Sequence, residues 1–253
     1  MYKYVLLFLV GFSSLQAQTY HWESVVLPND TFLYTAPTVE PVSYWMQSGY
    51  TPSGWSTGSS GFGYGDGDDT TEIPSPQISV FMRRDFEIIN ISDINRLVLD
   101  MDYDDGFVAY INGVEVARHL VSGSPVPFDQ ATDGLHEARL YRGLAPERFF
   151  LDTDMLVNGT NTLAVQVHNE SLTSSDMTAI PVLSLEVTGE TIAYNNTPSW
   201  FTDPDPAPFS FNSSNLPILF LETAGGQGIP DEPKIDATME ILERPDGTRN
   251  YVS

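Results

Sequence analysis

Hydrophobic and polar residues alternate along much of the chain between residues 20 and 190. This two-residue period is typical of half-buried β-strands, whereas the 3.6-residue period of an amphipathic helix is nearly missing. Gly, Pro, Asn and Asp separate the runs, which favours an antiparallel sandwich or barrel of about eight strands. The apolar sets expected to face the core are Ile78, Val80, Met82, Phe86 and Ile88; Leu97, Leu99, Met101 and Tyr103; Phe107, Ala109 and Ile111; Val114 and Val116; Leu163, Val165 and Val167; and Leu183, Leu185 and Val187.

The clearest single element is a β-hairpin within the stretch 101–119. Two alternating runs flank Asn112-Gly113, a dipeptide that readily adopts the two positive φ angles of a type I′ turn. Aspartate is disfavoured in strands, so carboxylates at the entrance of this hairpin make it a candidate functional element. These carboxylates are Asp102, Asp104 and Asp105.

The pattern divides the chain into a main domain and a shorter tail. Residues 18–190 are expected to form one jelly-roll β-sandwich. Several prolines and polar turn residues in 191–208 predict a linker, with a long loop inside one domain as the alternative. Apolar runs at 216–221 and 238–242 predict the first strands of a second β module over 209–253. This segment is too short to hold a core alone, so the chain is expected to be a fragment of a longer protein.

The N-terminus has the pattern of a secretory signal peptide over residues 1–17. Lys3 precedes an apolar run, and small residues lead to Ala17 as the cleavage position. The alternative is a membrane anchor, but the run is well short of the roughly 20 residues that span a bilayer. The protein is therefore expected to be secreted or at the cell surface, extracellular or periplasmic, with no membrane insertion after signal removal.

The composition narrows the range of partners. The chain has 34 acidic and 11 basic residues and a formal net charge of −23. A field of this sign repels phosphate backbones, which argues against nucleic acid, and it is compatible with neutral sugars and divalent cations. Cysteine is absent, so stability must come from a packed core rather than from disulfides.

A glycine-rich acidic loop, GFGYGDGDD at residues 61–69, precedes the hairpin. Calcium prefers several oxygen ligands, and glycine lets backbone carbonyls turn inward. This pattern predicts a calcium site that includes the hairpin entrance and the Ser174-Ser175-Asp176 turn, although a solvated turn explains the same residues. The candidate ligands are Asp66, Asp68, Asp69, Asp104, Asp105 and Asp176.

The candidate ligand-binding residues are aromatic residues and polar residues on the strand faces opposite the core. Gln166 and His168 alternate with core residues, so they are expected to leave the core and be free for polar contacts. Exposed tryptophans can stack on sugar rings, with core packing as the alternative. For His168 the alternative is a hydrogen bond to a neighbouring loop. The predicted ligand-binding set is Trp45, Trp55, Tyr103, Arg118, His168 and Asn169.

Enzyme motifs are missing from the sequence. The chain has no HExxH, GxSxG or cysteine, and no lysine between Lys3 and Lys234, which excludes a Walker loop or Schiff-base chemistry in the main domain. Asp104 and Asp105 are adjacent, and adjacent strand residues face opposite ways, so they cannot form a glycosidase pair on one face. The chain is expected not to be an enzyme.

Four segments together resemble a known family: GFGYGDGDD, YDDGFVAYINGVEVAR, NGTNTLAVQVHN with SSD after it, and FNSSNLPILFLETAGGQGIPDEPKIDATMEI. The first three resemble the N-terminal β-sandwich of secreted bacterial proteins of the spore-coat-protein-H-like (CotH) kinase family, and the fourth is similar to the start of the β module that follows. The hairpin also resembles those of galactose-binding-like jelly rolls. The resemblance implies that fold, a possible sugar ligand, and a kinase-like domain beyond Ser253.

Three functions compete on this basis. The leading hypothesis is a secreted, non-catalytic jelly-roll that binds a glycan or cell-surface polysaccharide, with a structural calcium ion in the acidic loops. The second is a spacer that positions downstream domains of the same longer protein, including a CotH-like kinase domain. The third, a hydrolase, is disfavoured by the missing motifs.

Overall fold

The computed structural model describes residues 19–65, 67, 69–189 and 191–204, and the backbone of four short strands beyond them. The chain divides into two compact units, residues 1–201 and 202–253. The predicted signal peptide lies outside the described residues. In the described part of the chain, no helix has the length and hydrophobicity that crossing a membrane requires.

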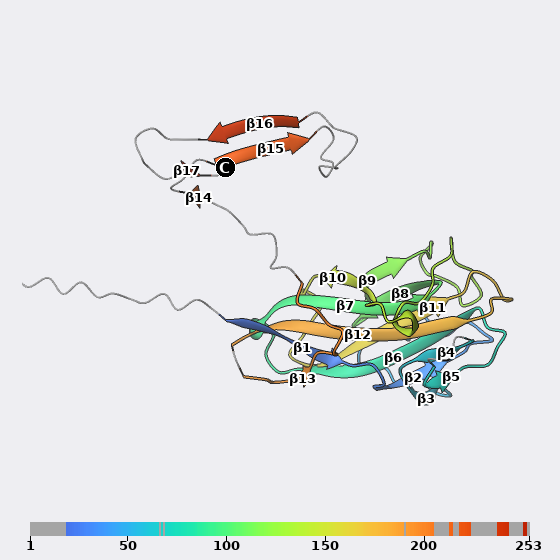
Figure 1. Cartoon of the computed structure of the whole chain (residues 1–253). Coiled ribbons are helices and arrows are strands. Elements are labelled where there is room, and N and C mark those ends of the chain that lie inside the picture. Colours follow the sequence, from blue (N-terminus) through green and yellow to red (C-terminus); the bar gives the residue numbers. More distant parts are fainter. Residues whose placement is uncertain are drawn as a thin grey trace, which may run out of the picture. The chain divides into compact units, whose positions relative to one another are not determined.

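The first unit is a two-layer β-sandwich, which confirms the predicted all-β class (Figure 1). We call its layers the β12 sheet and the β11 sheet. The β12 sheet contains, in order, β10 (Glu147–Leu151), β7 (Ile94–Asp104), β12 (Met177–Thr188), β1 (Tyr20–Val26) and β13 (Asn195–Asn196), with β4 (Phe62–Tyr64) beside β12 and β5 (Thr71–Glu72) beside β4. The β11 sheet contains, in order, β3 (Ser56–Ser59), β2 (Thr31–Thr35), β6 (Ser79–Ile88), β11 (Gly159–His168), β8 (Gly106–Ile111) and β9 (Val114–His119).

Pairing within both sheets is antiparallel, except for the short parallel pair of β4 and β5. Two 3₁₀ turns, η1 (Ile91–Asp93) and η2 (Leu140–Arg142), lie in the connections. Twelve strands lie in residues 20–188 of the described chain, against the eight expected. The difference lies in strands such as β3, β4 and β5, which are too short to show an alternating pattern.

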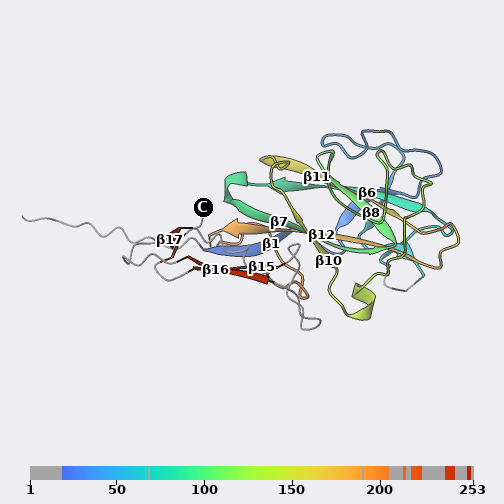
Figure 2. The same cartoon turned by 90° about the horizontal axis from the view of Figure 1, so that it is seen from above.

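The core between the two sheets follows the predicted alternation closely. The expected inward-facing residues of β6, β7, β8, β11 and β12 all belong to one buried cluster, except for Ile78, which precedes β6. Val116 packs against this cluster, while Val114, the first residue of β9, is 52% exposed. Figure 2 shows β6, β8 and β11 in one layer and β1, β7 and β12 in the other.

A second apolar cluster covers the opposite face of the β11 sheet, and we call it the outer cluster. Trp45, from the connection between β2 and β3, packs there on Phe81 of β6 and Tyr110 of β8, with ring centroids 4.9 and 5.8 Å apart. Val121 and Val126 come from the connection that follows β9. The central strands of this sheet are therefore buried on both faces.

The predicted hairpin is present, but it begins later than expected. Asn112 and Gly113 have φ angles of 52° and 84°, as a type I′ turn requires, and they join β8 to β9. Residues 101–104 belong to β7 in the other sheet. The stretch 101–119 is thus a sheet-to-sheet crossing followed by a hairpin.

The predicted linker begins as part of the sandwich. Residues 191–201 belong to the first unit, and β13 pairs there with β1. The Glu23 carboxylate of β1 accepts hydrogen bonds from the backbone amides of Ala193 and Tyr194. These contacts fix the first part of a segment whose composition resembles that of a linker.

The second unit contains two antiparallel pairs of strands among its described residues. β15 (Ile218–Thr223) pairs with β16 (Ala237–Leu242), and β14 (Ser213–Ser214) pairs with β17 (Asn250–Tyr251). The two expected apolar runs of the second module correspond to β15 and β16.

Candidate functional site

A single residue, Asp105, connects β7 of the β12 sheet to β8 of the β11 sheet. β7 ends at Asp104 and β8 begins at Gly106, and the peptide bond between the two aspartates is cis. Asp104 and Asp105 are each only 4% exposed. The premise that strand alternation separates these two carboxylates was wrong, because Asp105 lies outside both strands.

Asp105 and Asp102 anchor the loop that contains η2. The Asp105 carboxylate accepts hydrogen bonds from the backbone amides of His136 and Glu170, at 3.0 and 2.7 Å. Asp102 accepts from the amides of Arg139 and Leu140 in the same way, at 2.6 and 3.0 Å. Burial raises the pKa of both carboxyl groups, and these hydrogen bonds oppose that shift. Both oxygens of Asp105 are thus engaged, which argues against its predicted role as a metal ligand.

Three other carboxylates meet at this end of the sandwich, and we call them the acidic corner: Asp104, Glu137 and Asp176. They offer one oxygen each, and the three oxygens lie within 4.8 Å of one another. Asp104 is buried at the end of β7, whereas Glu137 and Asp176 come from the loops before η2 and β12. Oxygen donors that come from separate segments of the chain suit Ca²⁺ or Mg²⁺.

The backbone of the glycine-rich loop reaches the acidic corner. A Cβ atom added to Gly65 would lie 2.4 Å from the Ser175 carbonyl oxygen, so the loop backbone contacts the turn that contains Asp176. Asp69 is half-buried, and its Oδ1 would lie 2.3 Å from a Cβ at Gly63. Asp66 and Asp68 lie outside the described residues. Glu137 was not predicted, because it stands in a loop with no distinctive pattern.

His168 and Asn169 were expected to be free for ligand contacts, and this was wrong. His168 is fully buried and Gln166 is 2% exposed, because the loops of the outer cluster cover their face of the sheet. Asn169, which follows β11, is fully buried as well. His168 Nδ1 lies 2.8 Å from the Gln130 carbonyl oxygen, and burial lowers the pKa of His168 to about 4. The Asn169 amide donates to the Tyr64 hydroxyl and the Gln77 carbonyl.

Trp45 and Trp55 do not form an exposed aromatic platform. Trp45 is 4% exposed, and Trp55 packs against it with ring centroids 5.9 Å apart. Arg118 is held by Glu115 of the same strand and by the carbonyls of Val121 and Gly123 in the connection that follows β9. Its guanidinium donors therefore already have acceptors.

Tyr103 also has a structural role instead of the predicted ligand contact. Its ring is fully buried and stacks on His136 at 4.1 Å. Its hydroxyl donates to Glu147 at 2.6 Å and lies 2.7 Å from His119 Nδ1. Burial and the nearby Glu147 carboxylate raise the pKa of Tyr103. Burial also acts to raise the pKa of Glu147, but the hydrogen bond from Tyr103 and the nearby His136 outweigh burial, so the pKa of Glu147 is lowered.

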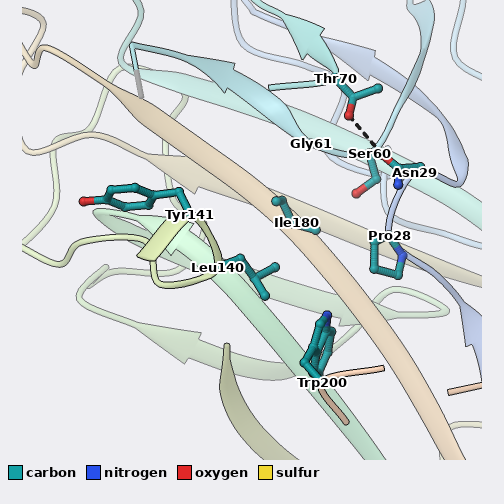
Figure 3. A pocket seen from close by; sticks show the side chains of 9 residues that line it. All are labelled: Pro28, Asn29, Ser60, Gly61, Thr70, Leu140, Tyr141, Ile180 and Trp200. Atoms are coloured by element: carbon teal, nitrogen blue, oxygen red, sulfur yellow. Dashed lines mark hydrogen bonds between the residues drawn. The ribbon is translucent and has the colours of Figure 1, made fainter. Parts of the chain in front are cut away.

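A pocket of about 230 Å³ opens on the outer side of the β12 sheet (Figure 3). Ile180 of β12 and Leu140 of η2 contribute apolar surface, and Trp200 and Tyr141 supply aromatic rings. Thr70 Oγ1 donates to Asn29 Oδ1 at 2.9 Å at another side of the pocket. The complete lining is Pro28, Asn29, Ser60, Gly61, Thr70, Leu140, Tyr141, Ile180 and Trp200.

The pocket and the acidic corner are connected through the η2 segment. The Tyr141 hydroxyl donates to Glu137 Oε2 at 3.4 Å. Trp200 was not among the predicted ligand-binding residues, because it stands in the predicted linker. A Trp-Phe pair within that polar, proline-rich segment was the available signal.

No protein-family model and no curated protein matches the chain. Among solved structures, it is similar to a β-glucuronidase from an uncultured Clostridium sp., with 14% identity and a TM-score of 0.43 over 93% of this chain and 41% of that one. It is also similar to a Bacteroides uniformis β-glucuronidase, with 13% identity and a TM-score of 0.43 over 91% and 27%. A calcium-binding mutant of B. uniformis β-glucuronidase 2 matches with 16% identity and a TM-score of 0.42 over 66% and 18%.

The chain thus spans less than half the length of these enzymes. Identities and TM-scores this low do not indicate a shared function.

Proposed function

We propose that this chain is a non-catalytic, glycan-binding module of a longer secreted protein, with a calcium ion in its acidic corner. The pocket beside Trp200 carries this proposal. It combines an aromatic ring with uncharged hydrogen-bonding groups, the combination that carbohydrate ligands need. The pocket is linked to the acidic corner by the hydrogen bond from Tyr141, which lines the pocket, to Glu137, which belongs to the corner.

A non-catalytic role agrees with the use of the buried carboxylates. Asp100 forms a two-point ion pair with Arg148, with contacts of 2.7 and 2.9 Å. Asp102 and Asp105 accept backbone amides. Acid-base catalysis needs a carboxyl group that can reach a substrate, and these three are committed to the fold.

Secretion and membership of a larger protein rest on the sequence. The N-terminal pattern supports export, and the resemblance to CotH-family proteins supports a downstream kinase-like domain as a partner. A spacer that binds nothing is the second candidate, favoured by the burial of Trp45 and Tyr103.

Affinity gel electrophoresis separates glycan binding from a spacer role. The full chain should migrate more slowly in gels that contain a polysaccharide it binds, because bound protein moves with the immobile polymer. Bovine serum albumin is the non-binding reference. If a broad panel of neutral and acidic polysaccharides causes no retardation, the spacer function replaces glycan binding.

Calcium is expected to stabilise the first unit. A ligand at 100 times its Kd contributes about 2.7 kcal/mol, which corresponds to about 5–10 °C in melting temperature for a domain of this size. Differential scanning fluorimetry with EDTA and then with CaCl₂ measures the shift, and MgCl₂ tests ion preference.

Asp176→Asn should abolish this calcium shift, because it removes one of the three carboxylates. Asp154→Asn is the matched control, since Asp154 is an exposed acidic residue outside the acidic corner. An equal melting temperature in EDTA and in millimolar CaCl₂ would contradict the calcium site and leave glycan binding untouched.

A further inference from the structure

We infer that the pocket beside Trp200 binds a neutral pyranose ring, which stacks on Trp200 and accepts a hydrogen bond from Ser60. This inference rests on the proposed function and specifies its site and sugar class. It follows from the fixed position of Trp200, an unsatisfied buried hydroxyl, and the size and charge of the pocket.

The segment that contains Trp200 is held in place on both sides. Phe201 packs on Trp22 of β1 with ring centroids 5.5 Å apart, and the Arg148 guanidinium lies 4.2 Å from the Phe201 ring centre. On the other side, β13 pairs with β1. A preorganised aromatic ring loses little conformational entropy when a sugar stacks on it.

The Ser60 hydroxyl is the second observation that points to a ligand. Ser60 is 1% exposed, and its Oγ has no hydrogen-bond partner among the described residues. Figure 3 shows this oxygen turned toward Ile180, within the group of lining side chains. A buried hydroxyl without a partner is unfavourable, and a sugar hydroxyl in the pocket would supply the missing acceptor.

The pocket volume limits the size of the ligand. About 230 Å³ is below the roughly 300–1,000 Å³ of pockets that enclose drug-sized ligands. One sugar ring fits this space better than an enclosed oligosaccharide. A polysaccharide would therefore present a single sugar residue to the pocket, either from the end of its main chain or from a branch.

Charge favours a neutral sugar. All nine lining residues are uncharged. The nearby Arg142 lies over the Tyr141 ring and donates to the Ala138 carbonyl. A uronate carboxylate would find no cation in the lining to pair with it, and it would meet the field of a chain with net charge −23.

Affinity electrophoresis of the full chain and three variants tests the inference, in gels with galactan, xylan, mannan, mixed-linkage β-glucan or polygalacturonate. We expect retardation by at least one neutral polysaccharide and none by polygalacturonate. Trp200→Ala should weaken the affinity at least about 10-fold through the lost ring contact. Ser60→Ala should weaken it about 2- to 10-fold, the range of one net hydrogen bond. Phe150→Ala, an exposed aromatic outside the pocket, should bind like the wild type.

Each alternative outcome has a distinct meaning. Retardation that is unchanged in both Trp200→Ala and Ser60→Ala overturns this pocket but leaves glycan binding in place. Retardation by polygalacturonate alone overturns the neutral-sugar assignment. No retardation by any polymer overturns the proposed function and this inference together. Ser60→Ala removes a hydroxyl that has no hydrogen-bond partner in the described part of the chain, so this variant should stay folded. It therefore keeps the test decisive if Trp200→Ala does not fold.

Discussion

Replacing Trp45 with alanine is expected to lower the free energy of unfolding by about 3–5 kcal/mol, the loss typical of truncating a buried tryptophan. Trp45 is 4% exposed and packs on Phe81 and Tyr110 in the outer cluster. Its carbonyl oxygen also accepts a hydrogen bond from the buried Arg83 guanidinium at 2.7 Å. The substitution would leave a cavity and loosen the loop that covers the β11 sheet. Equilibrium unfolding in urea measures the loss.

Two further variants show whether the effect comes from packing. Trp45→Phe keeps an aromatic ring and should lose less stability than Trp45→Ala. Val39→Ala, in the same connection but 74% exposed, should change stability by less than about 0.5 kcal/mol. A loss below about 1 kcal/mol for Trp45→Ala would mean that the outer cluster contributes little to the fold.

The inner core could be predicted from the sequence because one physical cause produces it. Side chains alternate across a strand, so residues such as Leu97, Leu99 and Met101 face the same layer, and they are buried there. The turn at Asn112-Gly113 could be predicted for a similarly local reason, because few other residue pairs accept two positive φ angles.

The outer cluster could not be predicted in this way. Gln166 and His168 alternate with core residues, which normally indicates a solvent-facing side of the strand. Loops distant in sequence cover that side, and Trp45 and Phe128 pack there. Loop packing has no periodicity, so the same pattern fits an exposed face and a covered one.

The acidic corner was predicted only in part. Asp104 was a candidate because a carboxylate among strand formers is conspicuous, and Asp176 because it ends a polar turn after a strand; the structure brings both together with Glu137. Asp105 had the same appearance, yet it accepts two backbone amides. Whether a buried carboxylate binds a cation or an amide depends on which loop folds over it, and that contact is long-range.

Acidification is expected to destabilise the first unit through His168. Burial lowers the pKa of His168 from its ordinary 6.5 to about 4. Between these two pH values, His168 binds a proton more readily in the unfolded chain than in the folded one. The contribution of the neutral, buried His168 to the stability of the folded chain is complete above pH 6.5 and is lost as the pH falls toward 4. At about 1.4 kcal/mol per pH unit, the loss reaches roughly 3 kcal/mol.

His168→Asn isolates this contribution from that of the carboxyl groups, which titrate in the same range. An asparagine amide can still donate to the Gln130 carbonyl, which the His168 ring contacts at 2.8 Å, but it does not titrate. Urea unfolding at pH 7, 6, 5 and 4 gives the stability of both proteins. The wild type should lose more than the variant, with the difference growing below pH 6.5. Parallel curves for the two proteins would show that His168 is not the group responsible, because only a titrating His168 makes their difference depend on pH.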